Sequence, residues 1–357
     1  MDPEHVEPVS LPCDLGEFDE IIDVRSPSEF AEDHLPGARS FPVLDDDRRA
    51  EVGTLYAEHP FAGRRVGAAL ITGRISELLE GEFASRPKGW RPLIYCWRGG
   101  LRSRSLAIIL RSIGWRARIL DGGYKAWRRH VTSELDRLLS DPRLDLHILS
   151  GLTGSAKTRI LESLAKAGAQ TLDLEGLANH RGSLLGSMGP QPSQKHFENL
   201  LYQQLASLDL ARPIFAEAES NRIGDVHLPA PYWKRLPAAR TYLISLPVEA
   251  RACYLLEDYP HLVERSTELT TLLDELRRLR GHEQVDQWQE LISAGSWQEF
   301  VTSILLNHYD LAYRAPGSEG CAYQSPAATL ELDDASQASV QEAAADLIDL
   351  ADRPRVP

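Results

Sequence analysis

The chain has 357 residues, of which 43% are hydrophobic and 25% charged, and it carries a formal net charge of −13. This length and composition indicate a globular protein with two domains, and no apolar run approaches the roughly 20 residues that cross a membrane. The first residues have neither the basic start nor the apolar core of a secretion signal, so we expect a cytoplasmic protein without a membrane partner. The four cysteines form no Cys-x-x-Cys pair, which argues against a disulfide framework and against a zinc site.

The negative net charge argues at first against a nucleic-acid partner, because contacts with phosphates supply most of the affinity of nucleic-acid-binding proteins. The charge is unevenly distributed, however. Residues 86–129, which we call the basic block, contain twelve Lys or Arg residues and one acid, a balance of +11. Such a block fits either a nucleic-acid contact or solvated helix faces, and charge alone does not separate the two.

The first predicted elements are a strand over residues 21–24 and a helix that follows it. Ser26 is a helix N-cap, Pro27 suits the first helical position, and Glu29 places an acid in the first turn. The stretch that begins at His34, with the sequence His-Leu-Pro-Gly-Ala, then returns the chain to a second strand.

A strand, a glycine turn and a helix follow each other around Cys96. The apolar run over residues 93–95 ends at Cys96, Gly99 and Gly100 form the turn, and a helical pattern covers residues 101–113. This arrangement aims several backbone N–H groups at one point beside a thiol. The sequence therefore predicts an anion site in which Gly99 and Gly100 let the backbone approach the anion.

Local charge makes Cys96 a candidate nucleophile. Arg98, Arg102 and the N-terminus of the predicted helix all favour the thiolate, which is the reactive form of cysteine. An inert cysteine on a core strand is the alternative. The Cys-x5-Arg spacing and the neighbouring glycines favour a catalytic Cys96 with Arg98 and Arg102 as its partners.

Three stretches in the correct order resemble the rhodanese family. Residues 18–43 are similar to its entry signature, residues 119–127 (Ile-Leu-Asp-Gly-Gly-Tyr-Lys-Ala-Trp) to its exit signature, and Cys96 stands where rhodanese-like domains carry their catalytic cysteine. Sulfurtransferase rhodaneses commonly have the loop arginine one residue closer to the cysteine. The longer loop to Arg102 resembles that of related phosphatases and suits a tetrahedral anion. Residues 45–88 exceed what the plain domain requires, and they form either a helical lid over the loop or an inert insertion.

A second glycine loop follows the predicted domain boundary between residues 140 and 141. The stretch Gly-Leu-Thr-Gly-Ser-Ala-Lys-Thr lies between a strand and a helix and is a Walker A loop whose second fixed glycine is replaced by Ala156. Such a loop wraps backbone N–H groups around a phosphate, with the lysine on the terminal oxygens and the threonine on magnesium. If the Ala156 position requires a positive φ, the alanine is strained; if it is helical, the cost is small. The candidate phosphate-binding residues are Gly151, Gly154, Ser155, Lys157 and Thr158.

The pattern after this loop predicts a doubly wound parallel sheet. Strands over residues 170–174, 213–217 and 240–246 alternate with helical patterns. Glu217 ends one of these strands in the manner of a Walker B carboxylate, which would orient water or hold Mg²⁺; a surface acid at a strand end is the alternative. The helical patterns over residues 264–313 indicate a core, with a structural role for His308, and the tail ends in an acidic helix that we expect to present a solvated face.

Taken together, the chain resembles the tRNA 2-selenouridine synthase family over nearly its full length. The matching stretches begin at Tyr95 (Tyr-Cys-Trp-Arg-Gly-Gly-Leu-Arg-Ser), Gly151, Asp173 (Asp-Leu-Glu-Gly-Leu-Ala-Asn-His-Arg-Gly-Ser-Leu-Leu-Gly), Glu217 (Glu-Ala-Glu-Ser-Asn-Arg-Ile-Gly) and Asn307 (Asn-His-Tyr-Asp). Ala156 and residues 218–221, where a more acidic run is expected, depart from the family pattern.

The resemblance implies an α/β chain and a transferase. Residues 1–140 would form a rhodanese-like domain, and residues 141–357 a P-loop domain with a helical C-terminal part. The implied reaction acts on the wobble 2-thiouridine of tRNA: geranyl diphosphate first alkylates the sulfur, and selenium from selenophosphate then displaces the S-geranyl group. Lys157 would stabilise the departing diphosphate, and Cys96 would take selenium as a selenenylsulfide. The basic block would bind the tRNA backbone.

The resemblance also supplies further site residues and partners. Asp173, Glu175 and Arg181, together with Asn179 and His180, are candidates for the geranyl or nucleobase site, and a merely structural glycine-rich loop is the alternative. Selenophosphate and geranyl diphosphate are expected as co-substrates, Mg²⁺ is a candidate ion at the P-loop, and neither a tightly bound cofactor nor another metal is predicted. Selenophosphate synthetase is a candidate partner.

Three other functions stay open at this point. A Cys-x5-Arg phosphatase fused to a kinase-like domain would release phosphate from phosphoesters. A rhodanese-type sulfurtransferase would make thiocyanate from thiosulfate. A noncatalytic tRNA-binding protein would still bind RNA after replacement of Cys96. The stretches that begin at Asp173 and Asn307 have no reason to exist in the first two.

Overall fold

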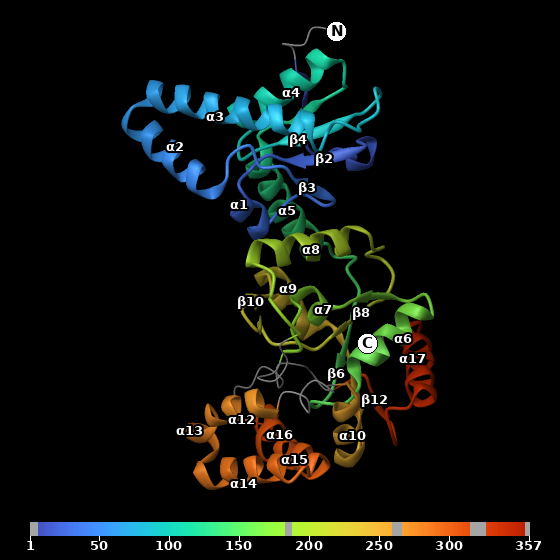
Figure 1. The fold of residues 1–357 in the computed structure, drawn as a ribbon. Coiled ribbons are helices and arrows are strands. Elements are labelled where there is room, and N and C mark those ends of the chain that lie inside the picture. Colours follow the sequence, from blue (N-terminus) through green and yellow to red (C-terminus); the bar gives the residue numbers. More distant parts are fainter. Residues whose placement is uncertain (1–5, 183–187, 259–265, 315–325, 354–357) are drawn as a thin grey trace. The chain divides into compact units, whose positions relative to one another are not determined.

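The computed structural model of the protein describes residues 6–182, 188–258, 266–314 and 326–353 (Figure 1). The chain forms two compact units. The first consists of Met1–Asp136 and Pro192–Tyr202, and the second of Arg137–Gln191 and Gln203–Pro357. The sequence pattern placed the boundary between residues 140 and 141 and did not indicate that an internal segment of the second half belongs with the first unit.

The first unit is built on a five-stranded parallel sheet with the strand order β1-β5-β4-β2-β3. The interior strands β2 and β4 contain Ile22 and Ile94, which are fully buried. Apolar runs of this kind suit a sheet that is covered on both faces. The fold is the α/β fold predicted from the sequence. The strands are β1 (Pro8–Val9), β2 (Glu20–Asp23), β3 (Ala38–Ser40), β4 (Pro92–Tyr95) and β5 (Arg118–Leu120).

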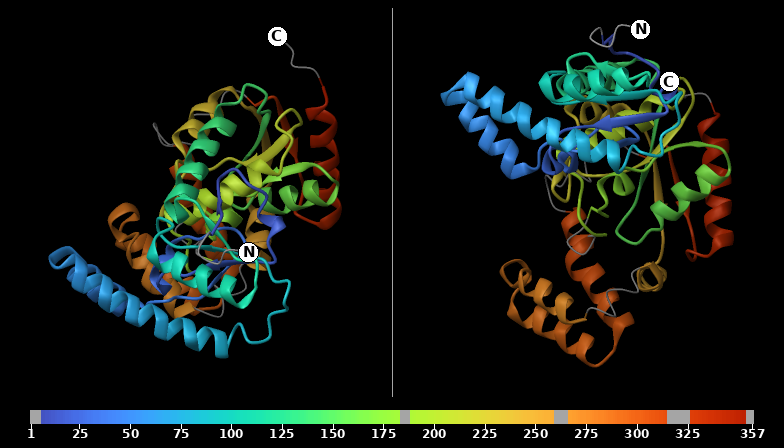
Figure 2. Two further views of the ribbon diagram at one scale, coloured as in Figure 1. Left: turned by 90° about the horizontal axis from the view of Figure 1, so that it is seen from above. Right: turned by 45° about the horizontal axis from the view of Figure 1, so that its top comes forward.

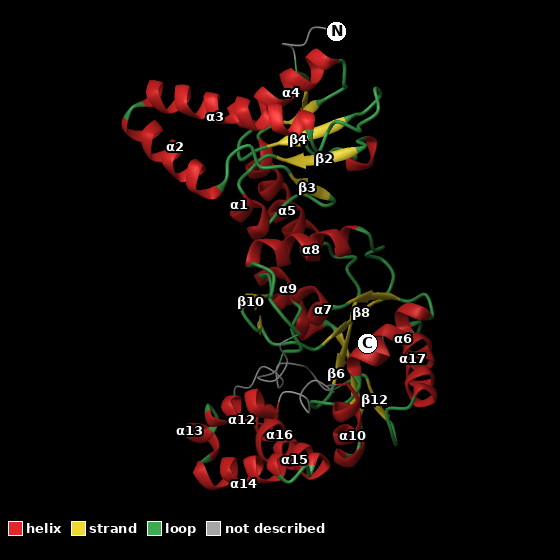
Figure 3. Cartoon of the chain, in the orientation of Figure 1, coloured by secondary structure: helices red, strands yellow, loops and turns green. Residues whose placement is uncertain are grey.

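Helices α1 (Pro27–Glu32) and α4 (Leu101–Ile113) and a short 3₁₀ turn η1 (Leu15–Glu17) connect strands of this sheet, and α5 (Gly123–Ser140) follows its last strand, β5 (Figure 3). Helix α1 begins after the predicted N-cap Ser26, and the structure adds that Ser26 and Glu29 form a capping box. Helix α4 begins and ends where the sequence pattern predicts, because Gly114 closes it in the left-handed conformation.

Two antiparallel helices, α2 (Asp46–Glu58) and α3 (Pro60–Glu80), form a hairpin that extends away from the sheet of this unit (Figures 1 and 2). Glycine allows the close crossing of the two helices, since a Cβ at Gly63 would lie 2.5 Å from Cα of Tyr56. The base of the hairpin contacts α1, where Ser28 Oγ donates to Asp46 at 2.5 Å, and α3 packs against α4. Its role as a lid over the Cys96 loop stays a prediction.

Helix α8 (Gln194–Ala206) begins within the first unit, and a buried carboxylate explains why. Asp33 is fully buried and accepts hydrogen bonds from Asn199 Nδ2 at 2.8 Å and from Tyr124 Oη at 2.8 Å. Asn199 also donates to His34 O at 2.7 Å. A buried charge requires such partners, so the start of α8 is needed to complete the polar core of the first unit.

The second unit contains a five-stranded parallel sheet with the order β12-β11-β6-β8-β7. The central strand β6 carries the Walker A loop at its carboxyl end, where ligands bind in open α/β sheets. The edge strand β12 was not predicted from the sequence. The strands are β6 (Leu146–Ser150), β7 (Gln170–Leu172), β8 (Ile214–Glu217), β11 (Arg240–Ser245) and β12 (Ala328–Glu331), with a separate antiparallel pair β9 (Arg222–Ile223) and β10 (Val226–His227).

Helices α6 and α17 pack side by side on this sheet (Figure 2). The tail helix α17 was expected to be amphipathic with a solvated face. Val340, Ala343 and Leu347 are buried beside α6, and the other side of the helix is exposed, in agreement with that expectation. The helices of the α/β part are α6 (Lys157–Lys166), α7 (Leu174–Ala178), α9 (Ala230–Arg235), the turn η2 (Leu236–Ala238), α10 (Val248–Asp258) and α17 (Gln337–Ala351).

The remaining helices form a cluster with its own core. Trp288 and Leu273 are fully buried there and Phe300 nearly so, as predicted. The elements are α12 (Ser266–Asp274), α13 (Arg277–Arg280), α14 (His282–Ser293), α15 (Trp297–Ile304), a π-helical turn η3 (Leu305–Tyr309) and α16 (Asp310–Arg314). Throughout the described ranges, no helix combines the length and the apolar character that crossing a bilayer requires.

Candidate functional site

Cys96 lies in the first residue position after β4 and is 3% exposed. Its sulfur has two close polar neighbours from the start of α4. The Gly100 backbone N–H donates to Sγ at 3.2 Å, and Ser103 Oγ lies 3.2 Å from Sγ. Ser103 is itself fully buried. A strand end, a loop and a helix N-terminus therefore converge on this thiol, as predicted.

The stretch after β5 supports the Cys96 loop. Tyr124 N donates to Cys96 O at 2.8 Å, and Lys125 N donates to Trp97 O at 3.0 Å. Gly123 has φ +56°, and a Cβ there would lie 2.2 Å from Cys96 O. Gly99 also has a positive φ of +67°. These contacts explain physically why a Gly-Gly-Tyr stretch accompanies the cysteine loop.

The two arginines predicted to hold the anion differ in their surroundings. Arg102 Nη1 donates to Glu29 Oε2 at 2.8 Å, and Arg49 lies 3.7 Å from the other carboxylate oxygen. Burial by itself would raise the pKa of Glu29, but the hydrogen bond and charge of Arg102 hold this pKa below its usual value. Arg102 is thus paired with a carboxylate in this structure, whereas Arg98 is exposed beside the loop.

The Walker A loop connects β6 to α6. A side chain at either of its glycines would clash with neighbouring atoms. A Cβ at Gly151 would lie 2.5 Å from Ile244 O, and Gly154 has φ +82° and abuts Leu255. Ala156 adopts φ 59° and ψ 22°, which is the left-handed region. The position therefore does require a positive φ, and the alanine carries strain of about 1–2 kcal/mol.

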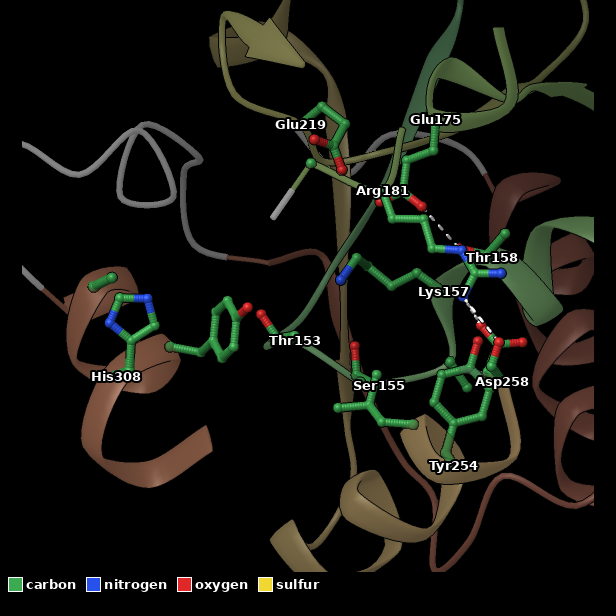
Figure 4. A pocket seen from close by; sticks show the side chains of 16 residues that line it. Thr153, Ser155, Lys157, Thr158, Glu175, Arg181, Glu219, Tyr254, Asp258 and His308 are labelled. Carbon is green, nitrogen blue, oxygen red and sulfur yellow. Dashed lines mark hydrogen bonds and ion pairs between the residues drawn. The ribbon is translucent and has the colours of Figure 1, made fainter. Parts of the chain in front are cut away.

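The functional groups of the loop face a common space (Figure 4). Lys157 Nζ donates to Gly151 O at 2.9 Å. Ser155 Oγ is buried and has no hydrogen-bond partner in the described part of the chain. Thr158 Oγ1 donates to Glu175 Oε2 at 3.3 Å. In Figure 4 the Lys157 side chain lies among the other labelled residues, with Glu175 and Glu219 on one side and Ser155 and Tyr254 on the other.

Carboxylates gather near the lysine. Glu217 is 1% exposed at the end of β8, and neither of its carboxylate oxygens has a hydrogen-bond partner among the described residues. Burial and then the charge of Glu175 raise the pKa of both Glu217 and Glu219 well above the usual 4.5, whereas Lys157 acts in the opposite direction. A cation at this position would relieve that repulsion.

The donor set fits Mg²⁺ bound together with phosphate. The described residues contain no group of three His, Cys, Asp or Glu side chains that could hold a metal by themselves. Mg²⁺ usually takes only one or two protein ligands and completes its shell with water and phosphate oxygens. Thr158 and Glu217, whose carboxylate oxygens have no partner among the described residues, are suitable ligands of this kind.

Of the candidate site residues that follow β7, one caps a helix and two line a cavity. Asp173 Oδ1 accepts from Gly176 N at 2.7 Å and caps α7. Glu175 and Arg181 line a cavity of about 300 Å³ beside the Walker A loop, and Arg181 forms an ion pair with Asp258. Neither Asp173 nor Glu217 is among the described lining residues. Residues 183–186 of the same stretch lie outside the described residues.

The cavity also has a wall that was not predicted from the sequence. Helix α10 contributes Tyr254 and Leu255, and the turn η3 with α16 contributes Tyr309 and Ala312. His308, expected to be structural, lines the cavity as well, and its Nδ1 accepts from Arg280 Nε at 3.1 Å. One feature of the sequence could have indicated this wall. The stretch that begins at Asn307 resembles the family but matches no phosphate-binding motif, so it pointed to a different part of the site.

A buried ion pair holds the wall to the loop. Arg251 and Asp310 are 3% and 4% exposed, and two hydrogen bonds of 2.9 and 2.8 Å join them. Arg251 Nη1 also donates to Thr153 O at 3.0 Å. One side chain of α10 thus contacts both the Walker A loop and the first residue of α16. Sequence reasoning named Asp310 only as part of a matching stretch and did not find Arg251.

Two protein-family models match the chain. The model of the tRNA 2-selenouridine synthase AAA domain matches residues 144–319, and that of the rhodanese-like domain matches residues 9–130. A tRNA 2-selenouridine synthase of Alcanivorax borkumensis is 34% identical over 82% of this chain and 88% of its own length. Proteins of the same description from Aeromonas salmonicida (32% identical, 82% of this chain and 86% of theirs) and Nitrosomonas europaea (34%, 73% and 66%) are also similar. The chain therefore belongs to the tRNA 2-selenouridine synthase family.

Proposed function

We propose that this protein is a transferase that makes 2-selenouridine in tRNA in two steps. A geranyl group from geranyl diphosphate is first placed on the sulfur of the wobble 2-thiouridine, and selenium from selenophosphate then replaces the S-geranyl group. The observation that carries the proposal is the presence in one chain of two strand–loop–helix turns that are candidate anion sites, one with a buried thiol at Cys96 and one with an ammonium group at Lys157. The names of the relatives support the overall reaction.

The first step suits the Walker A site. The uridine sulfur forms a bond to C1 of the geranyl group, the C1–O bond breaks, and diphosphate leaves with the electron pair. Lys157 and the N-terminal N–H groups of α6 would stabilise that leaving group. The neighbouring wall of Tyr254, Leu255, Tyr309 and Ala312 supports this assignment, because a geranyl chain requires apolar contacts beside its diphosphate.

Mg²⁺, when held by Thr158 and Glu217, would neutralise part of the charge of the diphosphate. The chain's own residues supply the rest of the site. Arg251 keeps the carbonyl of Thr153 in place, and Arg181 carries positive charge on the cavity wall. Arg181 would thus contact the diphosphate, and Arg251 would act indirectly by positioning the loop that holds it.

The second step suits the Cys96 loop. Sulfur attached to C2 is a poor leaving group until it is alkylated, so selenium enters only after geranylation. Arg98 lies exposed beside the loop and Arg102 lies at its end, where both could accept a phosphate-bearing selenium donor. The basic block would bring the tRNA to this unit. A selenophosphate synthetase would supply the donor.

One experiment tests both steps. Purified protein is incubated with 2-thiouridine tRNA, geranyl diphosphate and selenophosphate, and the nucleosides are identified by mass spectrometry. Lys157→Ala should block the appearance of the S-geranyl nucleoside. Cys96→Ser should let that nucleoside form and accumulate without conversion to selenouridine. Normal selenouridine from Cys96→Ser would refute the role of the thiol.

The same protein preparation separates the rival functions. A phosphatase would release phosphate from phosphoesters, and a plain sulfurtransferase would turn over thiosulfate but not selenophosphate. A noncatalytic tRNA-binding protein would bind tRNA and show none of these reactions. The proposal requires that the selenium-dependent reaction dominates and that it depends on geranyl diphosphate.

A further inference from the structure

The oxidation state of selenium limits what Cys96 can do. Selenium is formally −II both in selenophosphate and in the C2=Se group of 2-selenouridine, so the overall transfer involves no oxidation. A selenenylsulfide on Cys96 would contain an S–Se bond, and its formation from selenophosphate would remove two electrons. Neither the proposed reaction nor the site supplies an oxidant. The expectation that Cys96 carries selenium therefore does not balance.

The loop geometry favours phosphorus as the atom that Cys96 attacks. The spacing from Cys96 to Arg102 encloses a tetrahedral anion better than a bare selenium atom. Ser103 follows Arg102 directly, and its hydroxyl lies 3.2 Å from Sγ in a fully buried position. The Gly100 N–H donates to the same sulfur at 3.2 Å. Ser103 Oγ also donates to Gly100 O at 3.2 Å, so its hydroxyl hydrogen is placed to turn toward Sγ when that sulfur becomes charged, where it would join the Gly100 N–H in stabilising a departing thiolate.

We propose that Cys96 is a phosphoryl acceptor that releases hydrogen selenide from selenophosphate through a phosphocysteine intermediate. The inference rests on the proposed use of selenophosphate at this loop. In the first reaction the S–P bond forms, the P–Se bond breaks, and selenium leaves with the electron pair and the thiol proton as hydrogen selenide. No electrons are gained or lost overall.

The remaining steps also balance. The hydrogen selenide anion (HSe⁻) attacks C2 of the S-geranyl uridine and the C2–Se bond forms. The C2–S bond breaks to release geranyl thiolate, the selenium proton passes to N3 as the C2=Se group forms, and the thiolate takes a proton from water. A water molecule then attacks the phosphorus of phosphocysteine, the S–P bond breaks, and phosphate and the Cys96 thiol are regenerated. Ser103 acts in this last step, where its hydroxyl hydrogen-bonds to the sulfur that leaves as a thiolate.

The test uses full-length protein and selenophosphate, first without tRNA to follow the label and then with S-geranyl-2-thiouridine tRNA to follow selenouridine formation. One sample carries a label at phosphorus and a second carries a label at selenium. Phosphorus label should appear on the wild-type protein and be absent from Cys96→Ser. Ser103→Ala removes a hydrogen bond to a charged leaving group, so decay of the labelled protein should slow about 10- to 100-fold. Ser103→Thr keeps the hydroxyl and should restore decay. Ser105→Ala, on the same helix, is the matched control and should behave as wild type.

Each result decides the proposal. Retention of the selenium label on Cys96 without the phosphorus label would overturn it. Normal selenouridine formation would also overturn it if neither label were ever found on the wild-type protein or on Ser103→Ala. Equal decay in Ser103→Ala and Ser105→Ala would overturn the role of Ser103. Phosphorus label on Cys96 in a protein that never makes selenouridine would support the phosphoryl acceptor and refute the proposed function instead.

Discussion

At the scale of single residues, Gly123 ties the shape of the Cys96 loop to the start of α5. Any side chain at this position meets two obstacles, a positive φ and the carbonyl oxygen of Cys96 at 2.2 Å from the Cβ position. Gly37 offers a matched control, because it has φ +69° and nothing within 4 Å of its Cβ position. Gly37→Ala should cost only the left-handed strain, about 1–2 kcal/mol.

Gly123→Ala should cost more than Gly37→Ala in equilibrium unfolding and should abolish selenium transfer, because the carbonyl of Cys96 must move. Geranylation at the other unit should continue. Equal losses in the two variants, or an unchanged rate of selenium transfer, would show that the loop does not depend on this contact.

Glu29 gives the first unit a predictable dependence on pH. Its pKa lies below the usual 4.5 in the folded protein, since the Arg102 hydrogen bond and charge outweigh the effect of burial. The folded state therefore binds fewer protons than the unfolded state near this pH, so the stabilisation is present above pH 4.5 and is lost as the pH falls through the lowered pKa.

Glu29→Gln should lower the free energy of unfolding by about 1–3 kcal/mol at pH 7, because it leaves Arg102 without a charged partner. The difference from wild type should shrink as the pH falls below 4.5, and urea unfolding at a series of pH values measures it. Glu77→Gln, which removes an exposed partner of Arg74, is the control and should have little effect at any pH. A difference that stays constant with pH would contradict the lowered pKa of Glu29.

At the scale of elements, short sequence patterns correctly predicted the helices and loops that depend on contacts between residues close together in the chain. The limits of α4 followed from a glycine on each side of an amphipathic run, and the strand–loop–helix around Lys157 followed from a motif whose every residue is close in sequence. Ala156 shows the boundary of such reasoning. Its consequence depended on φ, and only the structure supplied that value.

Features that depend on contacts between residues far apart in the chain were not predicted from the sequence. The placement of α8 depends on Asp33, which is far away along the chain and has no local pattern that points to Asn199. Edge strand β12 depends on pairing with β11, and Arg251 looked like any helical arginine until Asp310 and Thr153 were brought to it. Contacts between residues that are remote in the chain produce no periodic pattern and no fixed spacing in the sequence, so sequence patterns do not predict them.

The Arg251–Asp310 pair should be measurable as a link between α16 and the Walker A loop. Asp310→Asn leaves a buried guanidinium without its counter-charge, which costs about 3–5 kcal/mol, and it should weaken binding of inorganic diphosphate measured by calorimetry. Arg251→Lys keeps the charge but cannot reach both partners, and it should weaken diphosphate binding with a smaller loss of stability. Asp274→Asn, which removes an exposed ion pair with Arg277, is the control. Full diphosphate affinity in a folded Arg251→Lys protein would refute the link.

At the scale of the whole molecule, the basic block has less unpaired positive charge than its composition suggests. Within the described residues, at least four of its twelve basic residues form ion pairs with acids from outside the block: Arg86 with Glu20, Arg91 with Asp19, Arg102 with Glu29 and Arg128 with Glu198. A count along the sequence cannot detect such pairing. The charge available for tRNA therefore comes from exposed members of the block such as Lys88, Arg116 and Arg129.

These exposed residues should control the salt dependence of tRNA binding. Each phosphate contact that is lost lowers the slope of log K against log salt by about 1, so replacing Lys88, Arg116 and Arg129 together by Gln should reduce the slope by up to about 3. Binding to unmodified tRNA, followed by fluorescence anisotropy at several salt concentrations, measures the slope. The matched control replaces Lys166, Arg212 and Arg278, which are exposed in the second unit, and it changes the net charge of the protein equally. If both triple variants lower the slope to the same extent, net charge rather than the basic block governs the encounter with tRNA.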